Sequence, residues 1–275
     1  MSDFEKQYYE SDEFWKNGML EDYANTIRIQ TTEAILPQDV QSLADIGCGN
    51  GVFGKYLQAK RPQLKIMGVE RSEKALTYVT TEKMMGDITD IPLPDNSYDC
   101  VTCLQVMEHI PVNHYNRALS ELTRVSRKYV VISVPYREKL EGNTTKCPQC
   151  RTVFNVDLHL RSYDDDTMNG LLKPFGFECI ATKNVVQSTE LRGIKYIQGI
   201  KQIMRKKPVI FNSPICPICG YENAEFQLGA SSEHSTVVSH PTPPGNAVKN
   251  LIKQIWPKKK VNGYWIIALY KKTLT

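Results

Sequence analysis

A glycine cluster is the first part of this 275-residue chain whose residue types and spacing could do chemistry. Gly47, Gly49 and Gly51 follow the apolar segment SLADI and precede a segment with helical spacing, residues 52–60. Glycines at such a strand-to-helix turn let a ligand approach the backbone, and a helix N-terminus offers free N–H groups to a carboxylate or phosphate. We therefore expect a cofactor site here. Residues 49–54 also fit GxGxxG, so a nicotinamide or flavin cofactor stays open at this point.

Further polar side chains follow two other apolar segments. Glu70 ends the segment LKIMGVE, where a carboxylate can accept hydrogen bonds from both ribose hydroxyls of an adenosine-bearing cofactor. Gln105, Glu108 and His109 follow the segment YDCVTCL, and we expect these three residues to serve catalysis at the cofactor's edge of the sheet. His109 is the candidate general base, because imidazole ordinarily titrates near neutral pH. The alternative is a histidine that only hydrogen-bonds a loop.

Two cysteine pairs have the form CPxC: Cys147 with Cys150, and Cys216 with Cys219. Two such turns can hold one zinc ion with four thiolates, which leaves no open position, so the predicted zinc is structural. The alternative is four free thiols. His159, which follows the first pair, is a candidate zinc ligand or substrate contact.

The elements that must position these residues alternate between strands and helices. Strands are expected at 42–46, 64–70, 83–85, 98–107, 128–136, 177–186 and 263–272, with helices at 52–60, 72–79, 113–126 and 162–174. This alternation predicts an α/β fold, a parallel sheet with helices on both faces. Four aromatic residues near the N-terminus could cover the cofactor or pack a capping helix onto the sheet: Tyr8, Tyr9, Phe14 and Trp15.

The string DIGCGNG, with the acid after the second strand and the segments GDI and LPDNSYDCVTCLQVMEHI, resembles in order the motifs of class I S-adenosylmethionine-dependent methyltransferases. The resemblance implies a Rossmann-like, seven-stranded, mostly parallel sheet whose last strand is antiparallel. It also implies that S-adenosylmethionine is the cofactor and that Asp87 and Ile88 contact the adenine. The residues expected to bind this cofactor are Asp45, Gly47, Cys48, Gly49, Gly51, Glu70, Arg71, Asp87, Ile88 and Leu104.

The domain organisation follows from the same pattern. Residues 1–40 are expected to form an N-terminal helical cap, and residues 41–186 with 262–275 the methyltransferase core. The insertions 137–161 and 187–261 would leave the same edge of the sheet and form a zinc-binding lid over the substrate.

The composition restricts the location and partners of the chain. No apolar run approaches the roughly 20 residues that span a bilayer, and the acidic N-terminus does not resemble a signal peptide, so we expect a cytoplasmic protein. The net charge of +4 does not by itself indicate a nucleic-acid partner. The basic amphipathic segments 191–207 and 246–260 either pack on the protein or lie at the inner membrane surface.

These features predict an enzyme that transfers a methyl group to an oxygen of a small molecule or glycan, which could be a lipid-linked surface saccharide. The segment NVDLHLRSY resembles one in bacterial methyltransferases that act on surface glycans. Related sequences carry Glu-x-x-Glu-His and bind a divalent metal, but Gln105 replaces the first glutamate, which weakens that case here. The alternatives are an RNA methyltransferase that grips phosphates with its knuckles and basic helices, and a cofactor-binding scaffold without turnover.

Overall fold

The computed structural model describes residues 9–10, 15, 23–185, 216, 218–219, 221 and 264–273. Its main sheet has the strand order β3-β2-β1-β4-β5-β9-β8. The bounds are β1 Ser42–Ile46, β2 Lys65–Glu70, β3 Glu82–Met85, β4 Tyr98–Leu104, β5 Ser126–Pro135, β8 Phe177–Val185 and β9 Trp265–Lys272. Strand β9 is antiparallel to both of its neighbours, and the other registers are parallel. The predicted seven-stranded sheet with an antiparallel last strand is confirmed.

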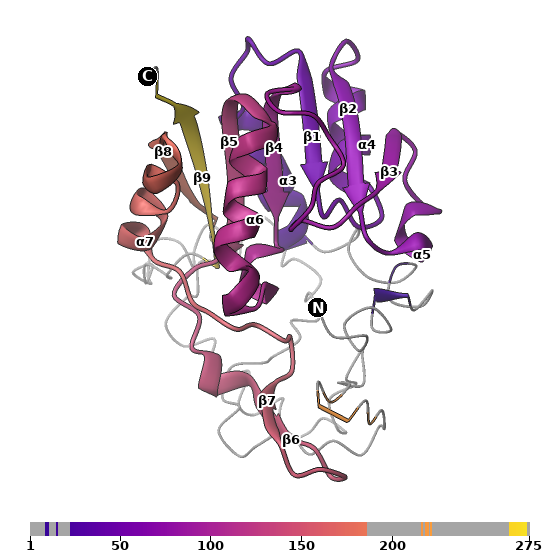
Figure 1. The fold of residues 1–275 in the computed structure, drawn as a ribbon, viewed down its shortest axis with the longest axis vertical. Helices are drawn as coiled ribbons and strands as arrows, with labels where there is room; N and C mark the ends of the chain where they lie inside the picture. Colours follow the sequence, from indigo (N-terminus) through magenta and orange to yellow (C-terminus); the bar gives the residue numbers. More distant parts are fainter. Residues whose placement is uncertain are drawn as a thin grey trace, which may run out of the picture.

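Helices cover both faces of the sheet (Figure 1). On one face lie α3 (Tyr23–Ile35) and α4 (Val52–Lys60), and on the other α6 (Val112–Val125) and α7 (Asp165–Gly170). Side chains of the strands alternate between the two cores, as the two-residue period requires: Leu43 packs with α3 and α4, and Ala44 packs with α6. The central strands are buried on both faces, which explains their nearly continuous apolar runs.

Two helices are shorter than the sequence predicts. The helix expected at 72–79 is α5 (Glu73–Leu76), although Ser72 does cap it by accepting a hydrogen bond from the N–H of Ala75. The helix expected at 162–174 becomes α7, capped by Asp164, and a separate turn η3 (Lys173–Phe175). Pro174 lies in that second turn, and its missing N–H cannot continue a helical hydrogen-bond ladder.

The first insertion projects beyond the carboxyl ends of the parallel strands (Figure 1). It contains η2 (Leu140–Asn143) and an antiparallel hairpin of β6 (Thr144–Lys146) and β7 (Val153–Asn155). Most of the second insertion, including the basic segments 191–207 and 246–260, lies outside the described residues. Among the helices that are described, none is long and apolar enough to cross a membrane.

Candidate functional site

The glycine turn after β1 has a backbone conformation that favours glycine. Gly47, Gly49 and Gly51 have φ angles of 72°, 54° and 76°, all in the left-handed region. A Cβ atom on Gly47 would lie 2.5 Å from Cγ2 of Val106, so a side chain there would also collide. The N–H of Gly47 donates to the carbonyl of Val69 over 2.8 Å, which fixes the turn against β2. The three glycines thus leave the backbone without side chains at the carboxyl edge of the sheet, where a ligand can approach it closely.

Glu70 ends β2 beneath this turn and is only 7% exposed. Its carboxylate accepts hydrogen bonds from the backbone N–H groups of Gly49 at 3.0 Å, Arg71 at 2.8 Å and Ser72 at 3.0 Å. An ionised carboxylate has about four lone-pair positions, so capacity remains for a ligand hydroxyl. The residues present therefore fit an adenosine-bearing cofactor.

The other residues expected to bind the cofactor border the same edge. Asp45 is buried and accepts a hydrogen bond of 2.6 Å from the hydroxyl of Thr102 on β4. Burial raises the pKa of Asp45 to about 6. After β3, the Asp87 carboxylate accepts hydrogen bonds from both the N–H and the hydroxyl of Thr89, which shapes the turn that buries Ile88. Cys48 is buried in the glycine turn, and Leu104 ends β4.

Aromatic residues from the N-terminal segment cover the turn. A ring atom of Trp15 lies 2.8 Å from the position that a Cβ on Gly49 would take. The indole N–H of Trp15 donates to the carbonyl of Tyr9, which also accepts from the Ser72 hydroxyl. The ring of Tyr9 lies 5.3 Å from the guanidinium of Arg71. These contacts favour a cover over the cofactor site; Tyr8 and Phe14 lie outside the described residues.

Glu10 adds an anchor that the sequence analysis missed. Its carboxylate accepts hydrogen bonds of 3.1 Å from the N–H groups of Glu73 and Lys74 at the start of α5. A carboxylate at a helix N-terminus accepts hydrogen bonds from backbone N–H groups that have no partner within the helix. The acidic residues of the N-terminal segment were the sequence feature from which this contact could have been predicted.

A polar cluster lies after β4, in the turn η1 (Met107–His109). The carboxylate of Glu108 is fully buried, and neither of its oxygens has a hydrogen-bond partner in the described part of the chain. Nδ1 of His109 is likewise buried and unpartnered there. The ring of His159 lies 4.8 Å from that of His109, centroid to centroid. One ligand atom from each of the three residues lies within 4.8 Å of the others.

The pKa of His109 differs from the sequence-based expectation that this imidazole titrates near neutral pH. Burial, with the positive charge of His159, lowers the pKa of His109 to about 3, so its imidazole does not titrate near neutral pH. Burial raises the pKa of Glu108 to about 7. The charge of the buried Arg28 acts on both Glu108 and Asp45. His109 is therefore uncharged at neutral pH, and its imidazolium form is strongly disfavoured.

The side chain of Gln105 binds to strand β5 rather than to Glu108 and His109. It has a φ of 61°, and its side-chain amide donates to the hydroxyl of Ser133 over 3.1 Å. Its backbone N–H donates to the carbonyl of the same residue. Both bonds tie Gln105 to β5.

The four cysteines of the two CPxC pairs meet at one point. Sγ of Cys147 lies 3.6 Å from that of Cys219, and Sγ of Cys150 lies 3.5 Å from that of Cys216. Disulfides need about 2.05 Å, whereas thiolates around tetrahedral zinc with bonds of about 2.3 Å are roughly 3.8 Å apart. The N–H of Cys150 also points at Sγ of Cys147, over 3.4 Å. The donor set and its spacing therefore fit zinc.

Two roles were open for His159, a zinc ligand and a substrate contact, and the structure places it away from these sulfurs and beside Glu108 and His109. Leu158 instead packs against the cysteine cluster, and His159, the next residue, reaches the cluster of Glu108 and His109. The N–H of Leu160 donates to the carbonyl of Glu108 over 2.8 Å. The path of the insertion places His159 beside Glu108 and His109, and this path could not be predicted from the sequence.

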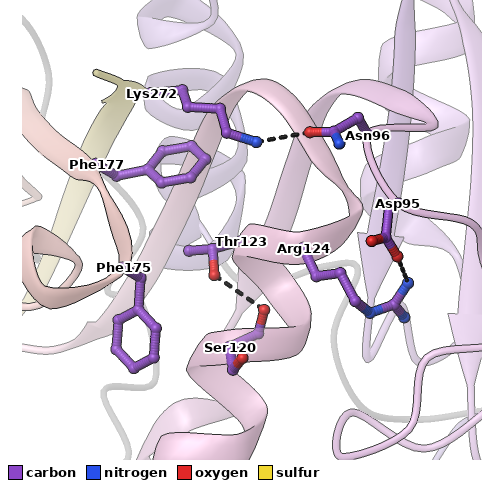
Figure 2. Close-up of a pocket in the computed structure, with 8 residues that line it drawn as sticks. All are labelled: Asp95, Asn96, Ser120, Thr123, Arg124, Phe175, Phe177 and Lys272. Carbon is purple, nitrogen blue, oxygen red and sulfur yellow. Dashed lines mark hydrogen bonds and ion pairs between the residues drawn. The ribbon is translucent and has the colours of Figure 1, made fainter. Parts of the chain in front are cut away.

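A hollow of about 340 Å³ lies at the opposite, amino-terminal edge of the parallel strands (Figure 2). Its charged groups are already engaged: Arg124 binds Asp95 over 2.7 Å, and the Lys272 ammonium donates to Asn96 over 2.6 Å. Phe175 adds an apolar wall. Because these charged groups of the hollow bind one another within the described residues, the carboxyl edge remains the candidate site.

Comparison with known proteins agrees with the geometry. Residues 44–132 match a methyltransferase domain family. A protein of Mycobacterium tuberculosis named a probable S-adenosylmethionine-dependent methyltransferase is 28% identical over 207 residues, which cover 70% of each chain. A ubiquinone biosynthesis O-methyltransferase of Neisseria meningitidis is 24% identical over 98 residues, 32% of this chain and 41% of that protein.

Solved structures share the fold. An S-adenosylmethionine-dependent methyltransferase from Archaeoglobus fulgidus superposes with a TM-score of 0.51 at 15% identity, covering 98% of both chains. One from Mesorhizobium loti has a TM-score of 0.50 at 12% identity, covering 90% of this chain and 98% of that one. At these identities the likeness concerns the fold alone.

Proposed function

The chain is a class I S-adenosylmethionine-dependent methyltransferase, and from this premise we propose that it methylates an oxygen atom of a small-molecule or glycan acceptor. The observation that carries the proposal is the buried polar cluster of Glu108 and His109 at the cofactor's edge of the sheet. Buried polar atoms without partners cost stability unless a ligand satisfies them. An acceptor hydroxyl is a ligand that would do so.

The glycine turn and its neighbours would hold the cofactor. The Glu70 carboxylate would accept the ribose hydroxyls, Asp87 and Ile88 would border the adenine, and the turn at Gly47 and Gly49 would take the amino-acid part. Asp45, Cys48, Gly51, Arg71 and Leu104 would complete this set. The cofactor supplies an electrophilic methyl group, which the acceptor oxygen takes with its lone pair while the sulfur keeps the electrons of the broken bond.

The chain's own residues would position the acceptor and exclude water. Tyr9 lies with its ring 6.5 Å from that of His109, so the N-terminal cover reaches the polar cluster. Nδ1 of His109 would accept a hydrogen bond from the acceptor hydroxyl, and the Glu108 carboxylate beside it would take the proton. The Gln105 side chain would hold this edge of the sheet through its hydrogen bond to Ser133. Such positioning accounts for a large part of the catalysis of bimolecular transfers.

The choice of an oxygen acceptor has two supports. One relative of the core domain carries the name ubiquinone biosynthesis O-methyltransferase. The chain also lacks the Asn-Pro-Pro-Tyr motif that accompanies methylation of nucleobase amino groups. A structural zinc held by the four cysteines would order the insertion that covers the acceptor side.

The test measures transfer of a labelled methyl group from S-adenosylmethionine by the full-length chain. The acceptors are hydroxylated aromatics, sugar nucleotides, lipid-linked saccharides and transfer RNA. We expect turnover with a hydroxylated small molecule or saccharide, and at least tenfold lower kcat for His109→Gln. His114→Gln, a histidine on α6 outside the polar cluster, is the matched control.

Two results would contradict the proposal. Label transferred to a nitrogen, or to RNA alone, would replace the acceptor class. Cofactor binding without turnover on any acceptor would favour a scaffold.

A further inference from the structure

We propose that Arg161 binds an oxyanion group of the acceptor, a carboxylate or a phosphate, beside the hydroxyl that receives the methyl group. The proposal rests on the proposed function, because it places this group next to the polar cluster of Glu108 and His109. It narrows the acceptor class to anionic molecules. Arg161 would thus determine specificity and take no part in the transfer itself.

Arg161 lies beside the polar cluster because two segments of the chain run side by side there. The N–H of Leu160 donates to the carbonyl of Glu108 over 2.8 Å. The guanidinium of Arg161 donates to the carbonyl of Ile110, which directly follows His109. The insertion therefore brings a positive charge to the edge of the cluster where the acceptor hydroxyl would bind.

The guanidinium of Arg161 is held in a fixed position. Its carbon atom lies 3.7 Å from the ring centre of Tyr115 on α6, which is a cation–π contact. The Tyr115 hydroxyl shares a hydrogen bond of 3.1 Å with the hydroxyl of the buried Tyr163. An arginine held in this way loses little side-chain freedom when a ligand binds, which favours recognition of an oxyanion.

The positive charge of Arg161 has no acidic partner in the described part of the chain. Other arginines there form ion pairs, as Arg124 does with Asp95 over 2.7 Å, but no such pair includes Arg161. The contacts to Ile110 and Tyr115 leave further N–H donors of the guanidinium, and these donors are not sealed from solvent. Such donors can bind a carboxylate or phosphate through two parallel hydrogen bonds.

The acidic residues near Arg161 do not exclude an anion. The Glu138 carboxylate is engaged by His159, whose Nδ1 lies 2.6 Å away, and the exposed Asp157 lies beside the same histidine. Burial raises the pKa of Glu108 to about 7, so a large fraction of this carboxyl group is uncharged at neutral pH. An oxyanion would therefore meet the fixed charge of Arg161, while the cluster beside it takes the hydroxyl.

The experiment measures the binding of small probes to the full-length chain in the presence of S-adenosylhomocysteine, which has no methyl group to transfer. Benzoate and phenyl phosphate carry the two kinds of oxyanion on the same ring, and benzamide is a neutral counterpart. Ligand-observed NMR titrations give the affinities. We expect Arg161→Gln to bind the preferred anion about tenfold or more weakly than the parent does. A larger loss for phenyl phosphate would assign a phosphorylated acceptor, and a larger loss for benzoate a carboxylated one.

Arg137→Gln is the matched control. The guanidinium of Arg137 also lies over a tyrosine ring, 5.1 Å from the ring centre of Tyr136, but it is paired with Asp165 over 3.5 Å. We expect Arg137→Gln to bind both anions as the parent does. Arg161→Lys keeps the charge without the planar set of donors, so it should keep part of the affinity that Arg161→Gln loses.

Two further affinities separate a binding role of Arg161 from a structural one. Arg161→Gln should keep the parent's affinity for S-adenosylhomocysteine and for benzamide. If Arg161 only fastens the insertion to the segment after β4, the affinities for the anions and for these two molecules would fall together, and the proposal would be wrong. Equal binding of both anions by Arg161→Gln and the parent would also overturn it, as would no anion binding by the parent at millimolar concentration.

Kinetics with an acceptor that the labelled-methyl screen identifies distinguish this proposal from the proposed function. Arg161→Gln should raise KM about tenfold or more and leave kcat within about threefold, whereas His109→Gln lowers kcat. If the anions bind as expected but no oxygen acceptor is methylated, the acceptor proposal fails and the oxyanion site stands. If Arg161→Gln methylates a neutral acceptor as well as the parent does, and binds both anions equally well, the oxyanion proposal fails alone.

Discussion

The backbone N–H of Gly49 donates a hydrogen bond to the Glu70 carboxylate over 3.0 Å. This bond joins the glycine turn after β1 to the acid that ends β2, so the two sequence signals form one unit in space. The same carboxylate holds the N–H groups that begin the next turn. Glu70 therefore shapes the turn as well as offering oxygens to a ribose.

Glu70→Gln should weaken binding of S-adenosylmethionine at least tenfold. Glutamine keeps the shape but has one acceptor oxygen, and its NH₂ group would face backbone donors; hydrogen bonds to charged groups contribute about 1.5–3 kcal/mol. Calorimetric titration checks the affinity. The exposed Glu73→Gln, three residues away, is the matched control and should bind as the parent does. Equal affinity in the two variants would remove Glu70 from the cofactor site.

Gly47→Ala should lower the free energy of unfolding by about 2–4 kcal/mol. The left-handed backbone costs a residue with a Cβ about 1–2 kcal/mol, and the collision with Val106 adds to this. Adding Val106→Ala to the Gly47→Ala variant should restore the part of the unfolding free energy that the collision costs, but not the part that the left-handed backbone costs. Urea unfolding of the single and double variants measures the coupling.

Gly170→Ala is the control for that pair. Gly170 lies in α7 with nothing within 4 Å of an added Cβ, so alanine should be neutral or stabilise by up to about 1 kcal/mol. A Gly47→Ala variant as stable as Gly170→Ala would contradict the steric argument.

Much of the fold could be predicted from local sequence. The run SLADI and the helical spacing of residues 52–60 correspond to β1 and α4 with the expected bounds, because period and burial agree there. The helix predicted at 162–174 was too long, since periodicity alone did not reveal the cap at Asp164 or the separate turn around Pro174.

The polar cluster shows what the sequence could not give. His109 was visible as a residue after β4, but its burial, and hence its low pKa, depends on the insertion that covers it. His159 follows the first cysteine pair along the chain, yet it lies beside a residue 50 positions earlier. Contacts of this kind depend on the path of an irregular insertion, for which no periodic pattern exists.

Cys147→Ser should abolish zinc binding. We expect one zinc ion per parent chain by mass spectrometry and almost none in the variant, because three thiolates close the site poorly. Cys179→Ser, in β8 away from the cluster, should keep its zinc. Full zinc in Cys147→Ser would show that the four cysteines do not share one ion.

The stability of the cofactor-free chain should fall as the pH rises through about 6, owing to Asp45. Burial raises the pKa of Asp45 to about 6, despite the hydrogen bond from Thr102. An unfolded aspartate titrates near 4, so the contribution of this group is fully present below about pH 4 and is lost as the pH rises through 6. A shift of about two pKa units corresponds to about 3 kcal/mol. Asp45→Asn should remove that loss and be more stable than the parent at pH 7.5.

Asp99→Asn should show the opposite sign in the same urea-unfolding series between pH 4 and 7.5. Although burial alone would raise it, the pKa of Asp99 is lowered by the N–H of Gln41 and by the charges of Lys128 and Arg127. Its contribution is therefore present above about pH 4 and is lost as the pH falls through the lowered pKa. Asp99→Asn should be less stable than the parent at pH 7.5, where Asp45→Asn is more stable. If Asp45→Asn and Asp99→Asn changed the stability in the same direction at pH 7.5, the opposite pKa shifts of these two carboxylates would not account for the pH dependence of stability.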